Sequence, residues 1–308
     1  MKLLRWGRSA YETPASIALE ERLLRALSLQ VMPNHLGEEP PVEGVGILAV
    51  TSKVRITSEL LDRAPALELV VTTTSGHEHI DAQACAARGV RVARCPLARR
   101  DAVVDTSLAL GLGLLRDLPG LQRRAEEGVW ARRELPDRSM RLARGLTVGV
   151  VGHGVIGARA AQVWRALGAR VRVSDPRMEA SSSLVELAES CQLLTLHCDL
   201  NPGSERMVDA SLLARMQPGA ILLNTARGGL VDVDALMEAH HLGGIGLDVF
   251  PIEPFPRLAE LARRPGVVLL PHAAGYHQDL GAGVAQELAD TVAAFLGGRP
   301  LPHPVSAG

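Results

Sequence analysis

The chain has 308 residues, of which 47% are hydrophobic and 22% charged, and its 33 basic and 34 acidic side chains nearly cancel. A length above about 250 residues predicts two domains, each with its own core. The balanced charge gives no general attraction to nucleic acid or to an anionic membrane, so we expect neither as a partner.

No apolar run reaches the ~18 residues of a membrane span. The opening segment, MKLLRWGRSAYE, contains no apolar stretch of the kind that a secretory signal has. We therefore expect a soluble cytoplasmic protein. The cysteines at positions 85, 95, 191 and 198 show no C-x-x-C spacing, so we expect no zinc or other bound metal.

Short apolar runs alternate with helical stretches, which is the pattern of α/β domains with parallel sheets. In the first half we expect strands at Lys2–Trp6, Gly46–Val50, Leu67–Thr72 and Val90–Ala93. The helices expected between them are Pro14–Leu29, Ser58–Arg63 and Ala82–Arg88. A long helix from Asp101 to Leu118, apolar on nearly all sides, follows. The arginine-rich stretch 119–144 has no clear period, and the pattern leaves open whether it is a loop, an arm or a dimer contact.

A second α/β series begins at Leu146. Its expected strands are Leu146–Val151, Arg170–Ser174, Leu193–Leu196, Ala220–Leu223, Ile245–Leu247 and Val267–Leu270. Its expected helices are Val155–Leu167, Leu184–Glu189, Ser211–Arg215, Val233–Ala239 and Val284–Leu296. We expect the proline-containing tail, Pro300–Gly308, to be loose.

The segment LTVGVVGHGVIG places Gly152, Gly154 and Gly157 between an apolar strand and a helix. In a G-x-G-x-x-G turn the glycines allow a tight turn, close approach of a pyrophosphate and close helix–strand packing. Asp175 lies at the end of the next strand, where a carboxylate accepts the ribose hydroxyls. A purely structural turn is the alternative. We predict a dinucleotide site that prefers NAD to NADP, although Arg177 could soften that preference.

Three charged residues, Arg227, Glu253 and His272, each follow or nearly follow a strand of the second series. That edge of an open α/β sheet is where ligands bind. An arginine fork binds a carboxylate, a histidine exchanges a proton near neutral pH, and a glutamate beside it stabilises the imidazolium. Each residue alone has a structural explanation, but together they predict hydride-transfer chemistry.

These segments resemble the D-isomer-specific 2-hydroxyacid dehydrogenases, which include phosphoglycerate, glycerate, lactate and erythronate-4-phosphate dehydrogenases. The resemblance extends over nearly the whole chain. GHGVIG is similar to the cofactor turn of the family, LLNTARGGLVD to its arginine motif, GLDVFPIEP to its glutamate motif and LLPHAAGY to its histidine motif.

The resemblance implies a catalytic set in which Arg227 binds and polarises a 2-oxo acid, His272 is the acid/base and Glu253 is its partner. It also implies that a substrate carboxylate is bound by Arg227 and by backbone N–H groups of Ser75, Gly76 and His77. The cofactor, NAD, would be contacted by Gly152, Gly154, Val155, Ile156, Gly157, Asp175, His197, Thr225, Ala226, Arg227, Asp248, His272 and Gly275.

For the whole chain we predict an α/β fold of two doubly wound, Rossmann-like parallel-sheet domains around a cleft. Residues 1–98 plus 276–308 would form a substrate-binding lid, and residues 99–275 the NAD-binding domain. Closure on a hinge would exclude water. The resemblance implies a homodimer formed through the region 119–145.

The predicted function is NAD-dependent hydride transfer between nicotinamide and a small 2-oxo acid or D-2-hydroxy acid. Departures from the family, namely Thr51, Lys53, His77, Arg99 and Asp199, leave the substrate open. One alternative is a 4-phosphoerythronate dehydrogenase, suggested by HAAGY, although Thr51 stands where such enzymes often have arginine. The other is a non-catalytic NAD-sensing scaffold or corepressor.

Overall fold

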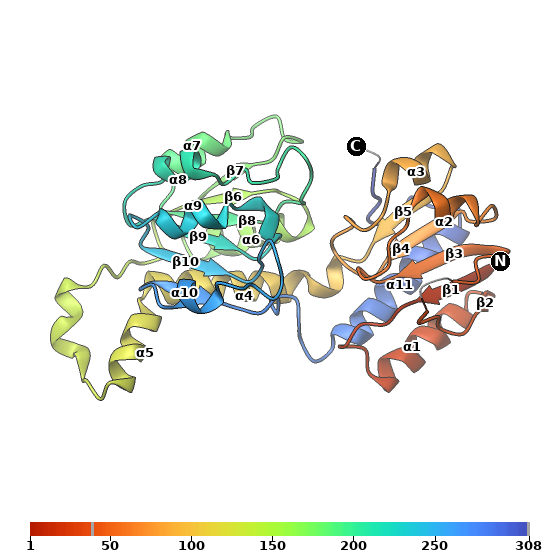
Figure 1. The fold of residues 1–308 in the computed structure, drawn as a ribbon, viewed down its shortest axis with the longest axis horizontal. Helices are drawn as coiled ribbons and strands as arrows, with labels where there is room; N and C mark the ends of the chain where they lie inside the picture. The colour runs from red at the N-terminus through yellow and green to blue at the C-terminus, as the bar shows by residue number, and fades with distance from the viewer. Residues whose placement is uncertain (38–39, 307–308) are drawn as a thin grey trace. The chain divides into compact units, whose positions relative to one another are not determined.

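The computed structural model describes residues 1–37 and 40–306, and the chain divides into two compact units (Figure 1). Unit 1 takes in Met1–Arg99 and Tyr276–Gly308, and unit 2 takes in Arg100–Gly275. Each unit is a parallel sheet covered by helices on both faces, which confirms the predicted α/β fold class.

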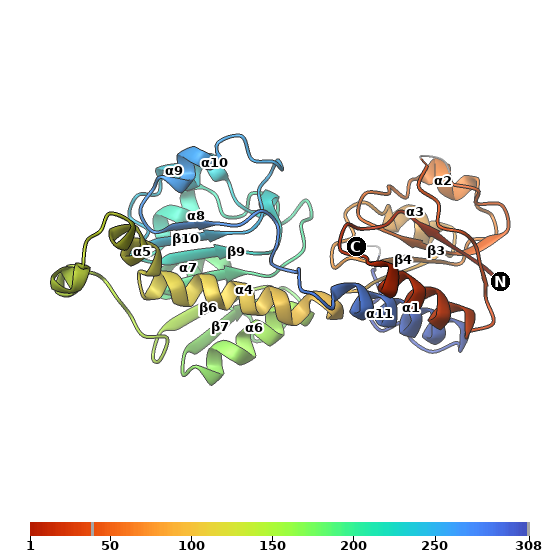
Figure 2. The same cartoon turned by 90° about the horizontal axis from the view of Figure 1, so that it is seen from below.

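Unit 1 has a sheet in the order β2-β1-β3-β4-β5, with every neighbouring pair parallel. Its strands are β1 (Lys2–Trp6), β2 (Gln30–Val31), β3 (Val45–Val50), β4 (Leu69–Thr72) and β5 (Arg91–Arg94). Its helices are α1 (Pro14–Arg25), α2 (Ser58–Asp62), α3 (Ala82–Ala87) and α11 (Leu280–Leu296). Figure 2 shows α1 and α11 side by side on one face and α2 and α3 on the other.

The central strand β3 explains why the sequence of this unit shows an apolar run without alternation. All six of its residues are buried. Leu48 and Val50 pack with the cluster that includes α2, whereas Ile47 and Ala49 pack with the cluster that includes α1 and α11. A strand that is covered on both faces needs apolar side chains at successive positions.

Unit 2 has a sheet in the order β11-β10-β9-β8-β6-β7, again parallel throughout. Its strands are β6 (Thr147–Val151), β7 (Arg170–Ser174), β8 (Leu193–Leu196), β9 (Ile221–Asn224), β10 (Gly244–Leu247) and β11 (Val267–Leu269). Helices α7 (Leu184–Ser190), α8 (Ala210–Arg215) and α9 (Val233–Glu238) pack on one face. Helix α6 (Val155–Ala166) and most of α4 (Leu97–Leu115) pack on the other.

The long helix α4 begins four residues before the predicted start and ends before Leu118. Its first turn follows Pro96, and the Glu287 carboxylate accepts the Leu97 and Ala98 N–H groups at 2.9 Å each. Helix α11 supplies this acceptor from 190 residues away. Asp117, with a positive φ of 49°, follows the end of the helix.

The stretch with no clear period contains helix α5 (Leu118–Glu126) and a 3-10 segment, η1 (Ala131–Asp137). Neither has a buried residue. Figures 1 and 2 both show this segment extending away from the sheet of unit 2. The sequence shows no continuous core-facing period here because neither element packs a residue into the core of unit 2.

The tail differs from its expected loose state over the part that the structure describes. Pro304 pairs antiparallel with Ala93 of β5, and the Val305 N–H donates to the Val92 carbonyl at 2.9 Å. The tail covers the edge of the sheet, where strand β5 would otherwise leave backbone groups without partners. Residues 307 and 308 of the predicted loose segment lie outside the described residues.

Other differences are small. Helix α1 ends at Arg25 rather than Leu29, helix α11 begins at Leu280 rather than Val284, and the short elements β2 and α10 (Leu258–Ala262) were not predicted. Within the described ranges, 1–37 and 40–306, no helix is both long and apolar enough to cross a membrane.

Candidate functional site

The glycine turn follows β6, which pairs with β7 on one side and with β8 on the other. The strand that follows β6 in the sequence therefore lies on one side of it, and the later strands lie on the other side. Such a switch point leaves a crevice at the carboxyl ends of the strands, where ligands of open α/β sheets bind.

Two glycines of the turn lack a side chain because the backbone leaves no room for one. Gly152 has a φ of +88°, and a β-carbon there would lie 2.7 Å from the Cys198 nitrogen. At Gly157 a β-carbon would lie 1.9 Å from the Gly152 carbonyl oxygen. These contacts bring the first turn of α6 against β6.

Gly154 is different, because the space above it is open. Within 4 Å of a β-carbon at Gly154 lies only a guanidinium nitrogen of Arg177, Nη2, at 3.8 Å, among the described residues. Gly154 is the N-cap of α6 and offers no side-chain cap, and Val155 and Ile156 form the first turn. Open space before a helix N-terminus fits a pyrophosphate, which the N–H groups and the helix dipole attract.

Asp175 lies directly after β7 and is 2% exposed. Its Oδ2 accepts the His153 N–H of the glycine turn at 2.7 Å, and its Oδ1 accepts the Arg177 N–H at 3.0 Å. Hydrogen bonds from the Arg177 guanidinium hold the pKa of this carboxyl far below its ordinary range. The acid is therefore ionised and tied to the turn at neutral pH.

Two further predicted cofactor contacts carry buried polar atoms that lack a hydrogen-bond partner in the described part of the chain. These atoms are Nδ1 of His197, after β8, and Oγ1 of Thr225, after β9. Buried polar atoms are normally paired. The glycine turn, Asp175 and these two atoms thus fit a polar, phosphate-containing ligand such as NAD.

His197 is linked to helix α4 by a chain of hydroxyl groups. Its Nε2 lies 3.0 Å from Oγ1 of Thr195, which lies 3.1 Å from Oγ of Ser107. Burial lowers the pKa of His197 to about 4, so the ring is neutral at neutral pH. A neutral imidazole carries one N–H, which leaves its Nδ1 either a donor or an acceptor toward a ligand.

Glu253 and His272 contact each other directly. Nδ1 of His272 lies 2.8 Å from Oε2 of Glu253. Because an ionised carboxylate only accepts hydrogen bonds, Nδ1 carries the proton and Nε2 is the atom that can exchange one with a ligand. The His272 side chain is 56% exposed and the Glu253 side chain is 37% exposed, so a small molecule can reach the pair.

Arg227 is joined to this pair through two close backbone contacts. It precedes a 3-10 segment, η2 (Gly228–Leu230), and a β-carbon at Gly228 would lie 1.9 Å from the Phe250 carbonyl carbon. The Phe250 N–H in turn donates to Oε1 of Glu253 at 3.0 Å. The arginine motif and the glutamate motif are therefore packed backbone to backbone.

Asp248 holds the loop that carries His272. The His272 backbone has a φ of +57°, and its N–H donates to the Asp248 carbonyl at 2.8 Å. The Asp248 carboxylate accepts the Ala273 and Ala274 N–H groups at 2.7 and 2.9 Å. The family resemblance implies that Asp248 contacts the cofactor. In the structure its carboxylate holds the loop of His272, whose backbone is strained.

The predicted substrate loop lies in unit 1, directly after β4. Four successive carbonyl groups of this loop accept hydrogen bonds, three from the surrounding scaffold and one from within the loop. Arg99 Nη1 donates to Thr73 O at 2.8 Å, Cys95 N to Thr74 O at 3.1 Å, Arg94 Nη1 to Ser75 O at 3.0 Å and Thr74 Oγ1 to Gly76 O at 2.9 Å. Because these carbonyl groups already accept hydrogen bonds, the loop presents N–H donors and the buried Ser75 hydroxyl to a ligand. Such a set of donors suits an anion.

Three residues that shape the site were not predicted. Asn224 is 1% exposed; its side chain accepts the Ala226 N–H at 3.0 Å and donates to the Arg227 carbonyl at 2.9 Å. His153 contributes its backbone N–H to Asp175. Phe250 stacks on Phe255 with ring centroids 4.9 Å apart. Asn224 could have been found, because it is a polar residue that ends an apolar strand.

The remaining expected residues are placed as follows. Ala226 lies between Thr225 and Arg227, and Gly275 is the last residue of unit 2. Thr51, after β3, is buried, and its Oγ1 has no hydrogen-bond partner among the residues described. Arg99 supports the substrate loop and also donates to the Tyr11 hydroxyl.

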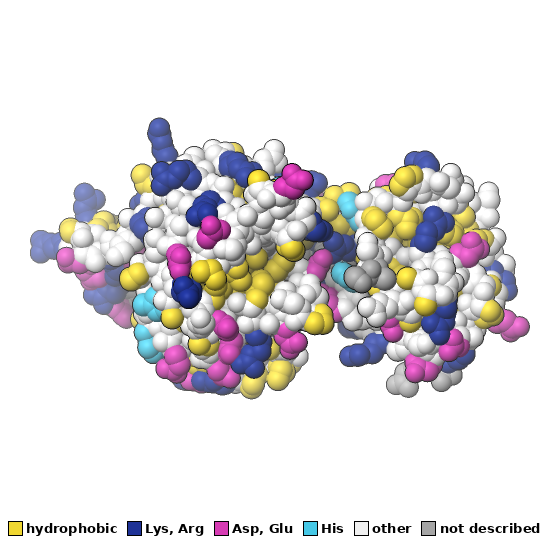
Figure 3. Space-filling model, turned by 90° about the horizontal axis from the view of Figure 1, so that it is seen from above, with side chains coloured by type: hydrophobic (Ala, Val, Ile, Leu, Met, Phe, Trp, Pro, Cys, Tyr) yellow, Lys and Arg dark blue, Asp and Glu magenta, His cyan; other side chains and the backbone are white. Residues whose placement is uncertain are grey.

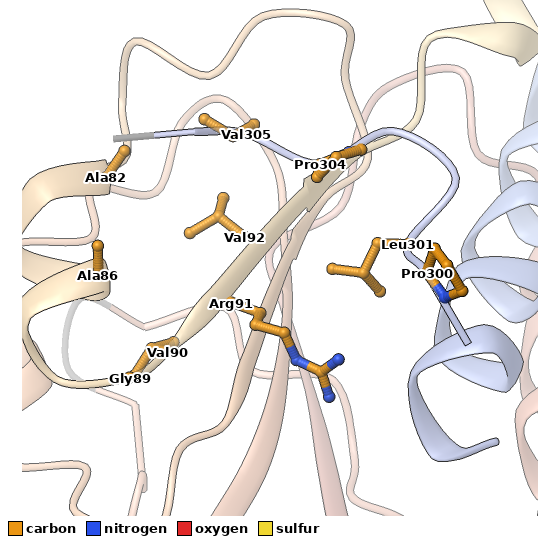
Figure 4. Close-up of a pocket in the computed structure, with 10 residues that line it drawn as sticks. All are labelled: Ala82, Ala86, Gly89, Val90, Arg91, Val92, Pro300, Leu301, Pro304 and Val305. Carbon is orange, nitrogen blue, oxygen red and sulfur yellow. The ribbon is translucent and has the colours of Figure 1, made fainter. Parts of the chain in front are cut away.

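A cavity of about 460 Å³ lies elsewhere in unit 1, between α3, β5 and the tail (Figure 4). Its lining is apolar except for Arg91, whose guanidinium lies 4.2 Å from the centre of the Phe295 ring. It holds none of the predicted site residues. Figure 3 shows basic and acidic side chains mixed over the visible face of each unit, without a continuous basic patch.

Comparisons with known proteins agree with this geometry. Residues 108–274 match the NAD binding domain of the D-isomer specific 2-hydroxyacid dehydrogenases. A D-3-phosphoglycerate dehydrogenase of Mycobacterium bovis is 33% identical over 275 residues, which are 85% of this chain and 51% of that protein. An (S)-sulfolactate dehydrogenase of Chromohalobacter salexigens is 33% identical over 270 residues, 83% of this chain and 86% of that protein. The chain thus spans about half the length of the mycobacterial relative.

Among solved structures, D-lactate dehydrogenase from Aquifex aeolicus, complexed with NAD and lactic acid, superposes with a TM-score of 0.79 and 26% identity. The match covers 97% of this chain and 96% of that chain. Together with the match of unit 2 to an NAD binding domain, this confirms the predicted cofactor, NAD. The chain belongs to the D-isomer specific 2-hydroxyacid dehydrogenase family.

Proposed function

We propose that this protein is an NAD-dependent oxidoreductase that interconverts a small 2-oxo acid and the corresponding D-2-hydroxy acid. The observation that carries the proposal is the 2.8 Å contact between His272 and Glu253 at the carboxyl edge of an NAD-binding domain. A histidine held by a carboxylate is a proton donor and acceptor near neutral pH.

In this proposal each residue has a defined role. His272 gives a proton from Nε2 to the carbonyl oxygen during reduction and takes it back during oxidation. Glu253 orients the ring through Nδ1 and stabilises the imidazolium. Arg227 binds the substrate carboxylate with its planar fork and polarises the carbonyl. Bound NADH supplies the hydride to the 2-carbon.

The loop of Ser75, Gly76 and His77 is proposed to bind the substrate carboxylate with N–H groups. Support comes from the four successive carbonyl groups of the loop that already accept hydrogen bonds within unit 1. Ser75 adds a buried hydroxyl without a partner in the described ranges. These features make the loop a donor surface, which is what a carboxylate requires.

The segment with α5 and η1 is proposed to form a homodimer contact. Trp130 is 87% exposed, and Leu118 and Leu142 are 56% and 65% exposed. Large apolar side chains on a projecting segment favour burial against a second copy of the chain. Sedimentation velocity of the wild type and of a Trp130→Glu variant tests this, because the charged side chain should shift the protein toward the monomer.

The two alternative functions have less support. A relative that acts on a phosphorylated hydroxy acid is among the matches, but Thr51 stands where 4-phosphoerythronate dehydrogenases often have arginine. A non-catalytic scaffold would retain NAD binding without turnover. The discriminating experiment is an NADH-oxidation screen over glyoxylate, hydroxypyruvate, pyruvate, longer 2-oxo acids and phosphorylated analogues. Turnover that His272→Ala abolishes supports the enzyme, whereas NADH binding without turnover of any of these acids contradicts it.

A further inference from the structure

Arg177 fills the hydrogen-bonding positions of the acid that should receive the adenosine ribose. Its backbone N–H and its Nε both donate to Oδ1 of Asp175 at 3.0 Å, and its Nη2 donates to Oδ2 at 2.8 Å. The His153 N–H occupies a second position on Oδ2 at 2.7 Å. Each carboxylate oxygen therefore accepts two hydrogen bonds, which is the capacity of its lone pairs.

Ribose hydroxyls that bind this acid must displace one of these donors. The two backbone N–H groups are fixed by the turn, whereas the Arg177 side chain is 68% exposed and the Asp175 side chain only 3%. The long exposed side chain is thus the partner that can move. NAD binding at Asp175 requires the guanidinium to leave at least one carboxylate oxygen.

The guanidinium also lies where a cofactor phosphate would meet it. A β-carbon at Gly154 would be 3.8 Å from Arg177 Nη2, so the cation stands over the open side of the glycine turn. A second acid, Asp199, also attracts this guanidinium, and its charge contributes to raising the pKa of Arg177. Arginine is the side chain best suited to bind a phosphate, because its fork donates two parallel hydrogen bonds.

We propose that Arg177 sets the cofactor selectivity of this protein by acting in opposite directions on two classes of ligand. It competes with the 2′- and 3′-hydroxyls of NAD for Asp175, which weakens NAD binding. When it turns away from Asp175 it pairs with a 2′-phosphate, so the site also accepts a 2′-phosphorylated adenosine. NADP(H) is then a second and weaker ligand, because the Asp175 carboxylate still repels its phosphate.

A purely structural ion pair makes a different prediction. If Arg177 served only to hold Asp175 in place, its removal would weaken every adenosine ligand together. The sign of the change for NADH therefore separates the two roles, and no catalytic measurement is needed. The inference rests on the NAD site of unit 2 and is independent of the proposed substrate.

The test is a set of binding titrations at fixed ionic strength on the intact protein. NADH, NADPH, 5′-ADP and 2′,5′-ADP are titrated by calorimetry into the wild type, Arg177→Ala and the control Arg170→Ala. Arg170 also carries one positive charge but lies at the start of β7, and its Nη2 donates to Thr147. Thermal unfolding of each variant verifies that it is folded.

For Arg177→Ala we expect tighter binding of NADH and 5′-ADP by a few-fold. Binding of NADPH and 2′,5′-ADP should weaken by on the order of tenfold or more, the scale of one lost charge-assisted pair. Arg170→Ala should leave the ratio of the Kd of NADPH to the Kd of NADH unchanged. Weaker NADH binding in Arg177→Ala, or equal changes for both ligand classes, would overturn the proposal. Failure of the wild type to bind 2′,5′-ADP more tightly than Arg177→Ala does would also overturn it, whereas failure to bind NADH at all would instead remove the cofactor site on which it rests.

Discussion

The Nδ1 of His272 lies 2.8 Å from Oε2 of Glu253, while Oε1 of the same carboxylate accepts the Phe250 N–H at 3.0 Å. One carboxylate thus holds both the ring of the proposed acid/base and the backbone of the loop that brings the arginine motif close. Removing the charge of this carboxylate while keeping its shape should therefore affect the proton transfer by His272 more than the position of the loop.

Glu253→Gln tests the charge. The amide nearly keeps the shape of the carboxylate but no longer stabilises an imidazolium. The kcat/KM of reduction at neutral pH should therefore fall relative to the wild type, because the charge that stabilises the proton-donating ring is lost. His272→Ala should reduce the rate by roughly 10²–10⁴-fold, the usual contribution of a general acid. A kcat/KM in Glu253→Gln that equals that of the wild type contradicts the assignment.

Arg227→Lys tests the substrate anchor. Lysine keeps the charge but lacks the fork that orients carboxylate and carbonyl together. The expected loss in kcat/KM corresponds to about 2–4 kcal/mol of transition-state stabilisation, by analogy with the loss of one positioned donor. Arg257→Lys serves as the control, because this exposed arginine pairs with Asp234 and Glu260. If Arg227→Lys stays within a few-fold of the wild type, the anchor lies elsewhere.

Two glycines of one turn should respond differently to alanine. At Gly157 a β-carbon would meet the Gly152 carbonyl at 1.9 Å, whereas at Gly154 it would meet only the exposed Arg177 guanidinium, at 3.8 Å, within the described chain. Gly157→Ala should therefore lower Tm, and Gly154→Ala should keep Tm but raise the Kd of NADH. Thermal unfolding and NADH titration of both variants check this. The idea fails if Gly154→Ala binds NADH as well as the wild type.

His197 should make the stability of the cofactor-free protein depend on pH. Burial lowers the pKa of His197 from 6.5 to about 4 in the folded chain. Above pH 6.5 the residue is neutral in both states, and its full contribution to stability is present. As the pH falls from 6.5 toward 4, the unfolded chain binds a proton that the folded chain does not, so stability decreases. The pKa shift corresponds to an upper limit of roughly 3 kcal/mol in the free energy of unfolding. The partial exposure of His197 makes the actual change smaller.

Thermal unfolding between pH 7.5 and 4.5 measures this effect. The Tm of His197→Gln should fall less over this range than that of the wild type, because glutamine does not titrate. His240→Gln is the matched control, since the His240 side chain is 74% exposed. Parallel pH dependence in the wild type and His197→Gln would show that His197 is not buried in its neutral form.

The sequence by itself determined the features that depend on short-range spacing. The glycine turn, the acid after the next strand and the three chemical motifs are each contained within about a dozen residues. The short apolar runs between turn residues likewise indicate strands that are covered on both faces. Strand β7 and strand β8 match their predicted bounds for the same reason. Local stereochemistry and side-chain pattern leave few alternatives at that scale.

Tertiary structure decided what depends on partners far along the chain. Helix α4 begins at Leu97 because Glu287, 190 residues later, accepts its first N–H groups. The tail pairs with β5 at Pro304 because β5 provides a sheet edge, and the Asp248 carboxylate holds the loop of His272 from 25 residues away. The same holds for Arg177: the sequence predicts an influence on cofactor preference, but only the structure shows which oxygens of Asp175 its guanidinium contacts. A hydrogen bond depends on the position of both atoms in space, and residue types along the chain do not contain that position until the sheet has ordered its strands.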